Sequence, residues 1–419
     1  MKRRLLLLAL FAVLAAFAML LSAAKGSVEI PTAEILNALG GAHGTVHEQI
    51  LWNIRLPRTI VAALVGINLS LSGAILQAIL RNPLASSSTL GISQGAAFGA
   101  AAAIILFNAG AQKQSLDGIV FSNPYLISVC AFIGAMLSTV IILGLSKIKK
   151  TTPETMILCG VALSSLFAGG TALLQYFADD VKIAAVVFWT FGNLGSTSHK
   201  EILIMGGAVC LSLTYFFFNG WNYNALQNGE STAKGLGVDT DVVRLAGMAV
   251  CSFTASVIVS YVGIINFIGL IAPHLMRRIV GSDYRFLLPA SAFAGAVLLL
   301  LSDTFARLAV QPVVLPIGAI TSFLGAPLFI ALIFKTGKQR ALDVQNAEFG
   351  YRGGTVIHNI SFSCESGHCL ALLGNNGAGK TTLLKCLNRI LGVRSGIVKI
   401  CGKDIRRMER NALAQHTAY

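Results

Sequence analysis

The sequence predicts an all-α polytopic membrane protein with about ten transmembrane helices, followed by a truncated α/β fragment that carries a P-loop. The 419 residues are 55% hydrophobic and only 12% charged, whereas about 25% of residues are charged in ordinary soluble domains. Long apolar runs recur up to residue 335, and the composition becomes polar after that point. These observations exclude a water-soluble enzyme for most of the chain, and they exclude disorder.

The first 335 residues supply the predicted membrane helices, because a helix needs roughly twenty apolar residues to cross a bilayer. The candidate spans are residues 5–23, 59–80, 90–108, 125–146, 155–177, 201–219, 242–262, 264–280, 286–306 and 317–335. The span at 264–280 is short and contains Pro273. Residues 184–194 form an apolar stretch too short to cross, which is typical of a re-entrant or interfacial helix. The N-terminus resembles a signal peptide, but the length of its apolar core favours an uncleaved first helix.

Small residues recur in these spans at helical spacing, as at Gly91, Gly95 and Gly99. Such spacing lets helices approach closely where lipid gives no hydrophobic drive for association. We therefore expect tight helix–helix contacts at these positions.

Basic residues predict the orientation. The net charge is +14, but Lys and Arg gather beside apolar stretches, which is typical of cytoplasmic loops and argues against nucleic-acid binding. With Lys2, Arg3 and Arg4 inside, alternation places both termini and the connections 81–90, 147–154, 220–241 and 277–285 in the cytoplasm.

Three arginines break this pattern, since Arg55, Arg58 and Arg307 then face outward. They either snorkel to lipid headgroups or form a basic external rim for an acidic partner. Asp303 lies one helical turn before Arg307, so it is either an intramembrane functional acid or the ion-pair partner of that arginine.

After a polar linker at 336–340, residues 341–419 read as a soluble α/β segment. Residues 341–349 and 355–364 predict short strands, residues 369–373 a buried strand, and residues 381–391 an amphipathic helix.

The segment 374–381 fits the P-loop pattern G-x-x-x-x-G-K-[ST], in which backbone N–H groups surround phosphate oxygens. Lys380 is expected to reach the β- and γ-phosphates of ATP, and the hydroxyl of Thr381 to ligate Mg²⁺. The candidate ATP-binding residues are Gly374, Asn375, Asn376, Gly377, Ala378, Gly379, Lys380, Thr381, Thr382 and Tyr351. Tyr351 either packs in a hairpin or stacks on adenine.

The chain ends before any acidic strand follows the P-loop, so we expect it to hold part of an ATP site but not to turn ATP over. The eight cysteines contain no CxxC pair and are read as reduced packing residues. His43 and His47 have i, i+4 spacing that could bind a metal, and His274 beside Pro273 favours helix packing.

Residues from about 50 to 335 resemble the FecCD-type permeases of ABC importers for iron–siderophores, haem and vitamin B12. The resemblance rests on RLPR at 55–58, SGAILQ at 72–77, RNPLA at 81–85, LGISQG at 90–95, FWTFG at 188–192, GLGV at 235–238, FIGLIAPH at 267–274, LPIG at 315–318 and LGAP at 324–327. Residues 341–419 similarly resemble the start of the ATPase subunit of such importers.

The resemblance implies an inner-membrane half-transporter that pairs with a second permease half, surrounded by membrane lipid. An external binding protein delivers the chelate and docks on Arg55, Arg58 and Arg307. Asn82 and Leu84 match the cytoplasmic gate. The residues that match the ATPase-coupling element are Gly229, Glu230, Gly235, Leu236 and Gly237.

The expected cargo is an iron–siderophore complex, with vitamin B12 or haem as the alternative. The ATPase is either a separate subunit or the remainder of this chain, whose P-loop portion lacks the Q-loop, signature motif and Walker B. A fragment, a natural truncation and a frameshift are all compatible with this. An ABC exporter is disfavoured because it needs no external basic rim, and a membrane-anchored ATP-dependent enzyme because no substrate site is present.

Overall fold

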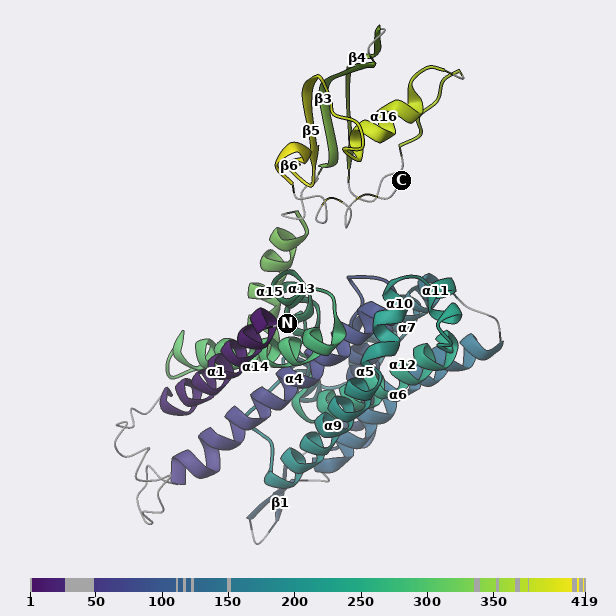
Figure 1. Ribbon diagram of the computed structural model, residues 1–419. Coiled ribbons are helices and arrows are strands. Elements are labelled where there is room, and N and C mark those ends of the chain that lie inside the picture. The colour runs from purple at the N-terminus through teal and green to yellow at the C-terminus, as the bar shows by residue number, and fades with distance from the viewer. Residues whose placement is uncertain are drawn as a thin grey trace. The chain divides into compact units, whose positions relative to one another are not determined.

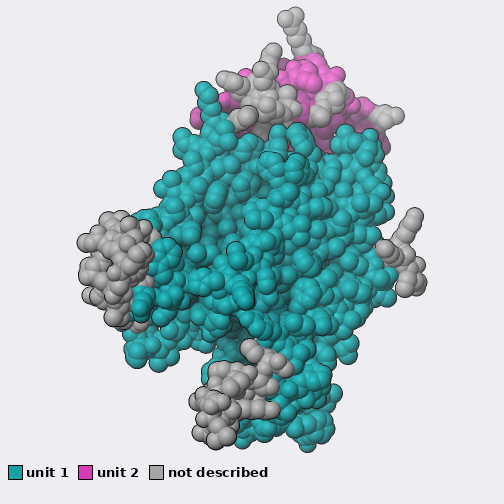
Figure 2. Space-filling model, turned by 90° about the horizontal axis from the view of Figure 1, so that it is seen from below, with its two compact units in different colours: residues 1–329 teal, residues 330–419 magenta. Residues whose placement is uncertain are grey.

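The computed structural model describes residues 2–26, 49–110, 112–115, 118–121, 124–148, 152–334, 340–351, 354–365, 370–375, 377–408, 413 and 417. Two compact units make up the chain, residues 1–329 and residues 330–419, which Figure 2 colours separately. Unit 1 is a helical bundle. The described part of unit 2 contains the last residues of the helix Ile317–Phe334, a small antiparallel sheet and the eight-residue helix Lys380–Leu387.

The helices of unit 1 follow the predicted spans (Figure 1). They are α1 (Lys2–Ala24), η1 (Leu51–Arg55), α4 (Leu56–Ile79), η2 (Ser88–Leu90), α5 (Ile92–Leu106), α6 (Pro124–Ile148), α7 (Pro153–Tyr176), α8 (Asp180–Thr190), α9 (His199–Phe218), α10 (Gly220–Gln227), α11 (Glu230–Gly235), α12 (Thr240–Val262), α13 (Ile268–Val280), α14 (Tyr284–Leu308) and α15 (Ile317–Phe334). A short hairpin, β1 (Gln112–Ser115) and β2 (Gly118–Phe121), joins α5 to α6.

Each of the ten predicted spans contains a helix, and among the described residues seven helices are long and apolar enough to cross a membrane. The predicted span 264–280 is the 13-residue helix α13. It begins only at Ile268, because Gly263 and Phe267 both adopt positive φ angles, of 75° and 67°. The expected short helix near 184–194 is α8.

Helix α4 lies at the centre of the bundle and packs against α1, α9, α12, α13 and α14. Most of its side chains are buried, including Leu71, Ile75 and Leu76. At the opposite extreme, α7 and α9 expose large apolar side chains such as Leu158 and Leu203, at 68% and 76%. Such exposed apolar faces suit lipid or a second membrane subunit.

Two close approaches explain the glycines of these helices. A Cβ atom on Gly73 of α4 would overlap the carbonyl oxygen of Gly269 in α13. A Cβ atom on Gly95 of α5 would overlap the carbonyl oxygen of Gly134 in α6. The tight contact expected from the small-residue spacing is therefore present, and these backbones touch without intervening side chains.

In unit 2 the strands β3 (Arg340–Tyr351), β4 (Gly354–Glu365), β5 (Ser395–Ile400) and β6 (Lys403–Asp404) form an antiparallel sheet in the order β4-β3-β5-β6. The first two confirm the predicted strands at 341–349 and 355–364. The helix predicted at 381–391 is α16 (Lys380–Leu387). It ends four residues early because Arg389 adopts a positive φ of 54°.

The prediction of a buried strand at 369–373 is wrong for the residues that the structure describes. Residues 370–375 are irregular, and Leu370 and Leu373 are 47% and 91% exposed. An apolar run becomes a strand only where neighbouring strands accept its hydrogen bonds. Within the described part of unit 2, no strand pairs with this segment.

Replacing Gly95 by alanine is expected to destabilise unit 1, because the added methyl group must push α5 away from α6. Overpacking of this kind costs about 1–3 kcal/mol. The apparent melting temperature of the purified protein measures the effect. Gly206→Ala in α9 is the matched control, since a Cβ there meets no atom within 4 Å. Equal melting temperatures for the two variants would contradict the expectation.

Candidate functional site

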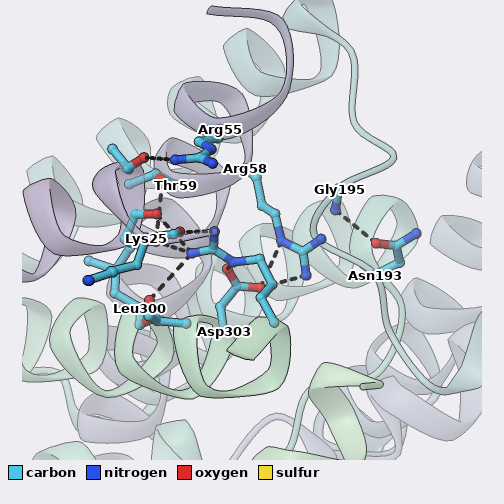
Figure 3. Close-up of polar contacts among 12 residues, drawn as sticks. Lys25, Arg55, Arg58, Thr59, Asn193, Gly195, Leu300 and Asp303 are labelled. Atoms are coloured by element: carbon cyan, nitrogen blue, oxygen red, sulfur yellow. Dashed lines mark hydrogen bonds and ion pairs between the residues drawn. The ribbon is translucent and has the colours of Figure 1, made fainter. Parts of the chain in front are cut away.

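A buried cluster of charged groups lies where α1 ends beside α4 and α14 (Figure 3). Its members, called here the arginine cluster, are Arg55, Arg58, Asp303 and Arg307. Arg58 donates from Nε and Nη2 to Oδ1 of Asp303 at 2.9 and 2.8 Å. Arg307 donates from Nε to Oδ2 of the same carboxylate at 3.0 Å. Two guanidiniums therefore share one carboxylate that is 0% exposed.

The ion pair of Asp303 with Arg307 confirms the i, i+4 pairing that the sequence suggested. The second partner of Asp303, Arg58, was not predicted. It lies 245 residues away in sequence, and sequence spacing reveals only neighbours on the same helix.

The arginine cluster also caps the end of α1. Arg307 donates to the carbonyl oxygens of Ser22 and Lys25 at 2.9 and 2.7 Å. Arg55, which is 5% exposed, donates to those of Ala23 and Ala24 at 3.2 and 2.8 Å. The last carbonyls of a helix lack intrahelical partners and carry partial negative charge, so guanidinium donors stabilise them.

Replacing Asp303 by asparagine is expected to destabilise unit 1 strongly, because two buried guanidiniums would lose their shared counter-charge. Breaking a buried ion pair on one side costs about 3–5 kcal/mol. Thermal unfolding at neutral pH measures this. Asp180→Asn, which removes an exposed carboxylate in the first turn of α8, is the control and should cost less than about 1 kcal/mol. Similar losses for both variants would show that Asp303 is dispensable.

The predicted coupling element forms a compact turn of two short helices, α10 and α11. Gly229 and Gly237 adopt positive φ angles of 112° and 80° at either side of α11. Glu230 is bonded to Lys234 and to Arg244 of α12, each at 3.3 Å. Partial burial raises the pKa of Glu230, but the hydrogen bond from Lys234 and the charge of Arg244 lower it overall. Leu236, directly after α11, is 68% exposed. Helix α11, which is tied to α12 through Glu230, therefore ends on an exposed apolar side chain.

The predicted gate residues lie in the connection between α4 and η2. The side-chain oxygen of Asn82 accepts a hydrogen bond from the backbone N–H of Leu84 at 2.8 Å. This local bond closes a turn of the Asx type. Leu84 is 46% exposed, and the turn holds it away from the bundle core.

Asp283, before α14, ties α10 to α14. Asn224 Nδ2 donates to its Oδ1 at 2.9 Å, and Arg285 Nη2 donates to its Oδ2 at 2.7 Å. The hydrogen bonds from Arg285 and Asn224 lower the pKa of Asp283 to about 2, although partial burial acts in the opposite direction.

A carboxyl group with a lowered pKa in the folded state stabilises the fold above its ordinary pKa of 3.8. That contribution is lost as the pH falls through the folded value of about 2. Asp283→Asn should therefore lower the melting temperature at neutral pH, and the difference from the parent protein should shrink as the pH falls. A pH series of thermal unfolding measures this, with Asp180→Asn as control. A difference that is constant across the series would contradict the assignment.

The P-loop lies at the start of α16. Gly379 adopts a φ of 86° as the N-cap of α16 and makes no side-chain cap, so the N–H groups of the first turn are not covered by a capping side chain. Nζ of Lys380 donates to the carbonyl oxygens of Gly374 and Asn375. The helix N-terminus and the lysine therefore present positive charge at one place, which fits the phosphates of ATP. Asn376 lies outside the described residues.

Tyr351 ends β3 and is 51% exposed, and its ring contacts Phe349 edge-on at 5.1 Å between centroids. The packing role is thus present, and stacking on adenine stays a prediction.

His274 packs against Phe329, as expected, with 6.2 Å between the two ring centroids. His43 and His47 lie outside the described residues. Among the residues that the structure does describe, no group of three His, Cys, Asp or Glu side chains could hold a metal ion.

Comparisons with known proteins show which families this chain resembles. The model of the FecCD transport family matches residues 14–335, and the ABC transporter family model matches residues 357–419. An ABC transporter permease of Methanocaldococcus jannaschii is 52% identical over 75% of this chain and 90% of its own length. The hemin transport system permease of Yersinia pestis is 35% identical over 70% of this chain and 85% of its own.

A solved structure, described as a metal-chelate type ABC transporter in an inward-facing conformation, superposes with a TM-score of 0.68 at 28% identity. It covers 78% of this chain and 98% of that one. The fold and these matches define a multi-pass membrane permease of an ABC importer, followed in the sequence by an ATP-binding segment. The chain belongs to the FecCD transport family.

Proposed function

We propose that this permease carries iron–siderophore complexes across the membrane into the cytoplasm, driven by ATP. The single observation that carries this proposal is the FecCD match, which covers residues 14–335 and therefore nearly all of unit 1. Relatives are named as permeases for hemin, vitamin B12 and iron(3+)-hydroxamate. All three cargoes are bulky chelates of a metal, so haem and vitamin B12 are the rival outcomes.

ABC importer permeases dimerise and act with ATPase subunits and a substrate-binding protein. In the proposed organisation, residues 1–335 are the permease domain, residues 336–340 a linker and residues 341–419 the ATPase portion. The exposed apolar faces of α7 and α9 support contact with lipid or with a second permease half.

The arrangement of unit 1 supports the proposed topology. Figure 1 shows that the N-terminal end of α1 lies at the same end of the bundle as α10 and α11, while the β1–β2 hairpin lies at the opposite end. Arg3 and Arg4 belong to the first turn of α1. The coupling element at Gly229, Glu230 and 235–237 would then face the ATPase, and the turn at 82–84 would form the cytoplasmic gate.

At the opposite end, the arginine cluster is proposed to receive the binding protein. Arg58 and Arg307 share one carboxylate, which leaves one positive charge in excess, and their side chains are 14% and 10% exposed. Asp303 already holds both guanidiniums in place, so a carboxylate of the partner could bind them with little loss of arginine side-chain entropy.

Cargo is tested by transport. The full chain is reconstituted in proteoliposomes with its cognate ATPase and binding protein, and uptake of ferric hydroxamate, hemin and cyanocobalamin is compared. The proposal requires ATP-dependent uptake of the ferric hydroxamate in preference to the other two. Preferred uptake of hemin or cyanocobalamin would replace the cargo, and ATP-dependent efflux would overturn the importer assignment.

Nucleotide binding is tested with Lys380→Ala in the full chain. Loss of the ammonium should weaken binding of a fluorescent ATP analogue by about ten- to a hundred-fold, since hydrogen bonds to charged groups contribute about 1.5–3 kcal/mol. Lys385→Ala, in the last turn of the same helix, is the control and should bind normally. Undiminished binding by Lys380→Ala would show that the P-loop is not the nucleotide site.

A further inference from the structure

A cavity of about 430 Å³ lies in unit 1 between the end of α4 and the helices α10, α13 and α14. Polar and basic side chains line it, including Gln77, Arg81, Gln227, Arg277, Ser282 and Tyr284. Gln77 and Tyr284 are 4% and 0% exposed, so they belong to the helix core. The volume lies within the range of sites that hold small ligands.

The charges of this cavity are unbalanced. Two guanidiniums, those of Arg81 and Arg277, line it, and none of the lining residues is an acid. Glu154, at the start of α7, lies within the electrostatic reach of Arg81 but does not line the cavity. The carboxylate of Asp283, next to the cavity in sequence, accepts bonds from Asn224 and Arg285. Like charges that share a cavity repel one another unless an anion lies between them.

The position of Arg277 is fixed by a buried amide. Its Nη1 donates to Oε1 of Gln77 at 3.1 Å, and Nε2 of Gln77 donates to the carbonyl oxygen of Gly269 at 3.4 Å. This bond to Gln77 uses one of the five N–H donors of the guanidinium. Arg277 is therefore held at the wall of the cavity by a side chain that is itself in the core.

Arg81 is held in a conformation that residues other than glycine rarely adopt. Its φ is 48°, directly after the C-cap of α4, where glycine would carry no Cβ penalty. Residues with strained backbone conformations are found preferentially at functional sites, so the positive φ of Arg81 marks the cavity as a candidate site. An arginine at this position brings a second planar fork of donors to the cavity.

We propose that this cavity is a binding site for a phosphate group, held between the guanidiniums of Arg81 and Arg277. The guanidinium fork matches the oxygens of a phosphate in pairs, and the hydroxyl of Ser282 and the amide of Gln227 add neutral donors. The group belongs to a small soluble anion or to a lipid headgroup. Its chemistry is the same in both cases.

The site has a mechanical consequence that rests on the proposed function. Arg81 begins the turn proposed as the gate, and Gly229, which also lines the cavity, begins the proposed coupling element. A phosphate group bound between Arg81 and Arg277 would therefore lie in a cavity that both segments line. Binding itself does not depend on the cargo.

The test uses the full chain with Lys380→Ala, which removes phosphate binding by the P-loop, in phosphatidylcholine nanodiscs. Inorganic pyrophosphate is titrated at constant ionic strength, and calorimetry and thermal unfolding are recorded. Saturable binding is expected. Arg81→Gln and Arg277→Gln should each weaken it by about ten-fold, which corresponds to the loss of one charge-assisted contact. Arg278→Gln, next to Arg277 but outside the cavity lining, is the matched control.

Arg81→Lys and Arg277→Lys keep the positive charge but lose the paired donors of the guanidinium, so they should lose an intermediate amount of binding affinity. They also serve as controls in case the glutamine variants fail to fold. A second arm replaces pyrophosphate with nanodiscs that contain phosphatidylglycerol. Stabilisation only in that arm, dependent on both arginines, supports the site and assigns the phosphate to lipid.

Two outcomes overturn the proposal. One is that Arg81→Gln and Arg277→Gln behave like Arg278→Gln in both arms. The other is that acetate stabilises the chain as well as pyrophosphate does, which would mark the cavity as a receptor for a carboxylate side chain of the ATPase. Transport is measured separately, so a chain that transports but shows an arginine-dependent response to neither pyrophosphate nor phosphatidylglycerol refutes this site alone. A chain that binds but does not transport refutes the proposed function alone.

Discussion

The arrangement of unit 1 depends on one buried carboxylate. Asp303 is 0% exposed and is bonded to Arg58 and Arg307. A charge inside a helical bundle is tolerated only where partners satisfy it completely. The two guanidiniums satisfy Asp303, and Arg307 extends the network to the carbonyl oxygens at the end of α1. Helices α1, α4 and α14 are thereby joined by interactions that apolar packing alone would not direct.

Close contact between backbones makes this network possible. Helix α4 approaches α13 at Gly73 and α14 at Gly66, where a Cβ atom on either glycine would overlap a neighbouring carbonyl group. In lipid, apolar side chains gain little by leaving one neighbour for another, so intimate packing and satisfied polar groups decide which helices associate. The glycines bring the helices together, and the charges determine their pairing.

The other end of the bundle is organised differently. There, polar side chains fix short segments outside the apolar spans: Glu230 holds α11 against Arg244 of α12, and Asp283 holds α10 through Asn224. Both carboxyl groups have lowered pKa values because they accept hydrogen bonds from cationic or amide donors. In the topology proposed above, this end faces the ATPase, and these bonds would stiffen the segments that transmit force. In unit 2, the P-loop brings the N-terminus of α16 and the ammonium of Lys380 together, an arrangement that suits phosphates.

The sequence alone predicts the ten helical segments, since apolar length and helix geometry permit few alternatives, and the P-loop, whose glycines and lysine stand at a fixed spacing. It also indicated the pairing of Asp303 with Arg307, because residues four apart share a helix face. The pairing of Asp303 with Arg58, the capping of α1 by Arg55 and Arg307, and the cavity lined by Arg81 and Arg277 become visible only in the folded chain. These contacts join residues far apart in the chain, and no local period encodes them. The irregular segment at 370–375 has the same origin, because a strand requires partners that its own sequence does not contain.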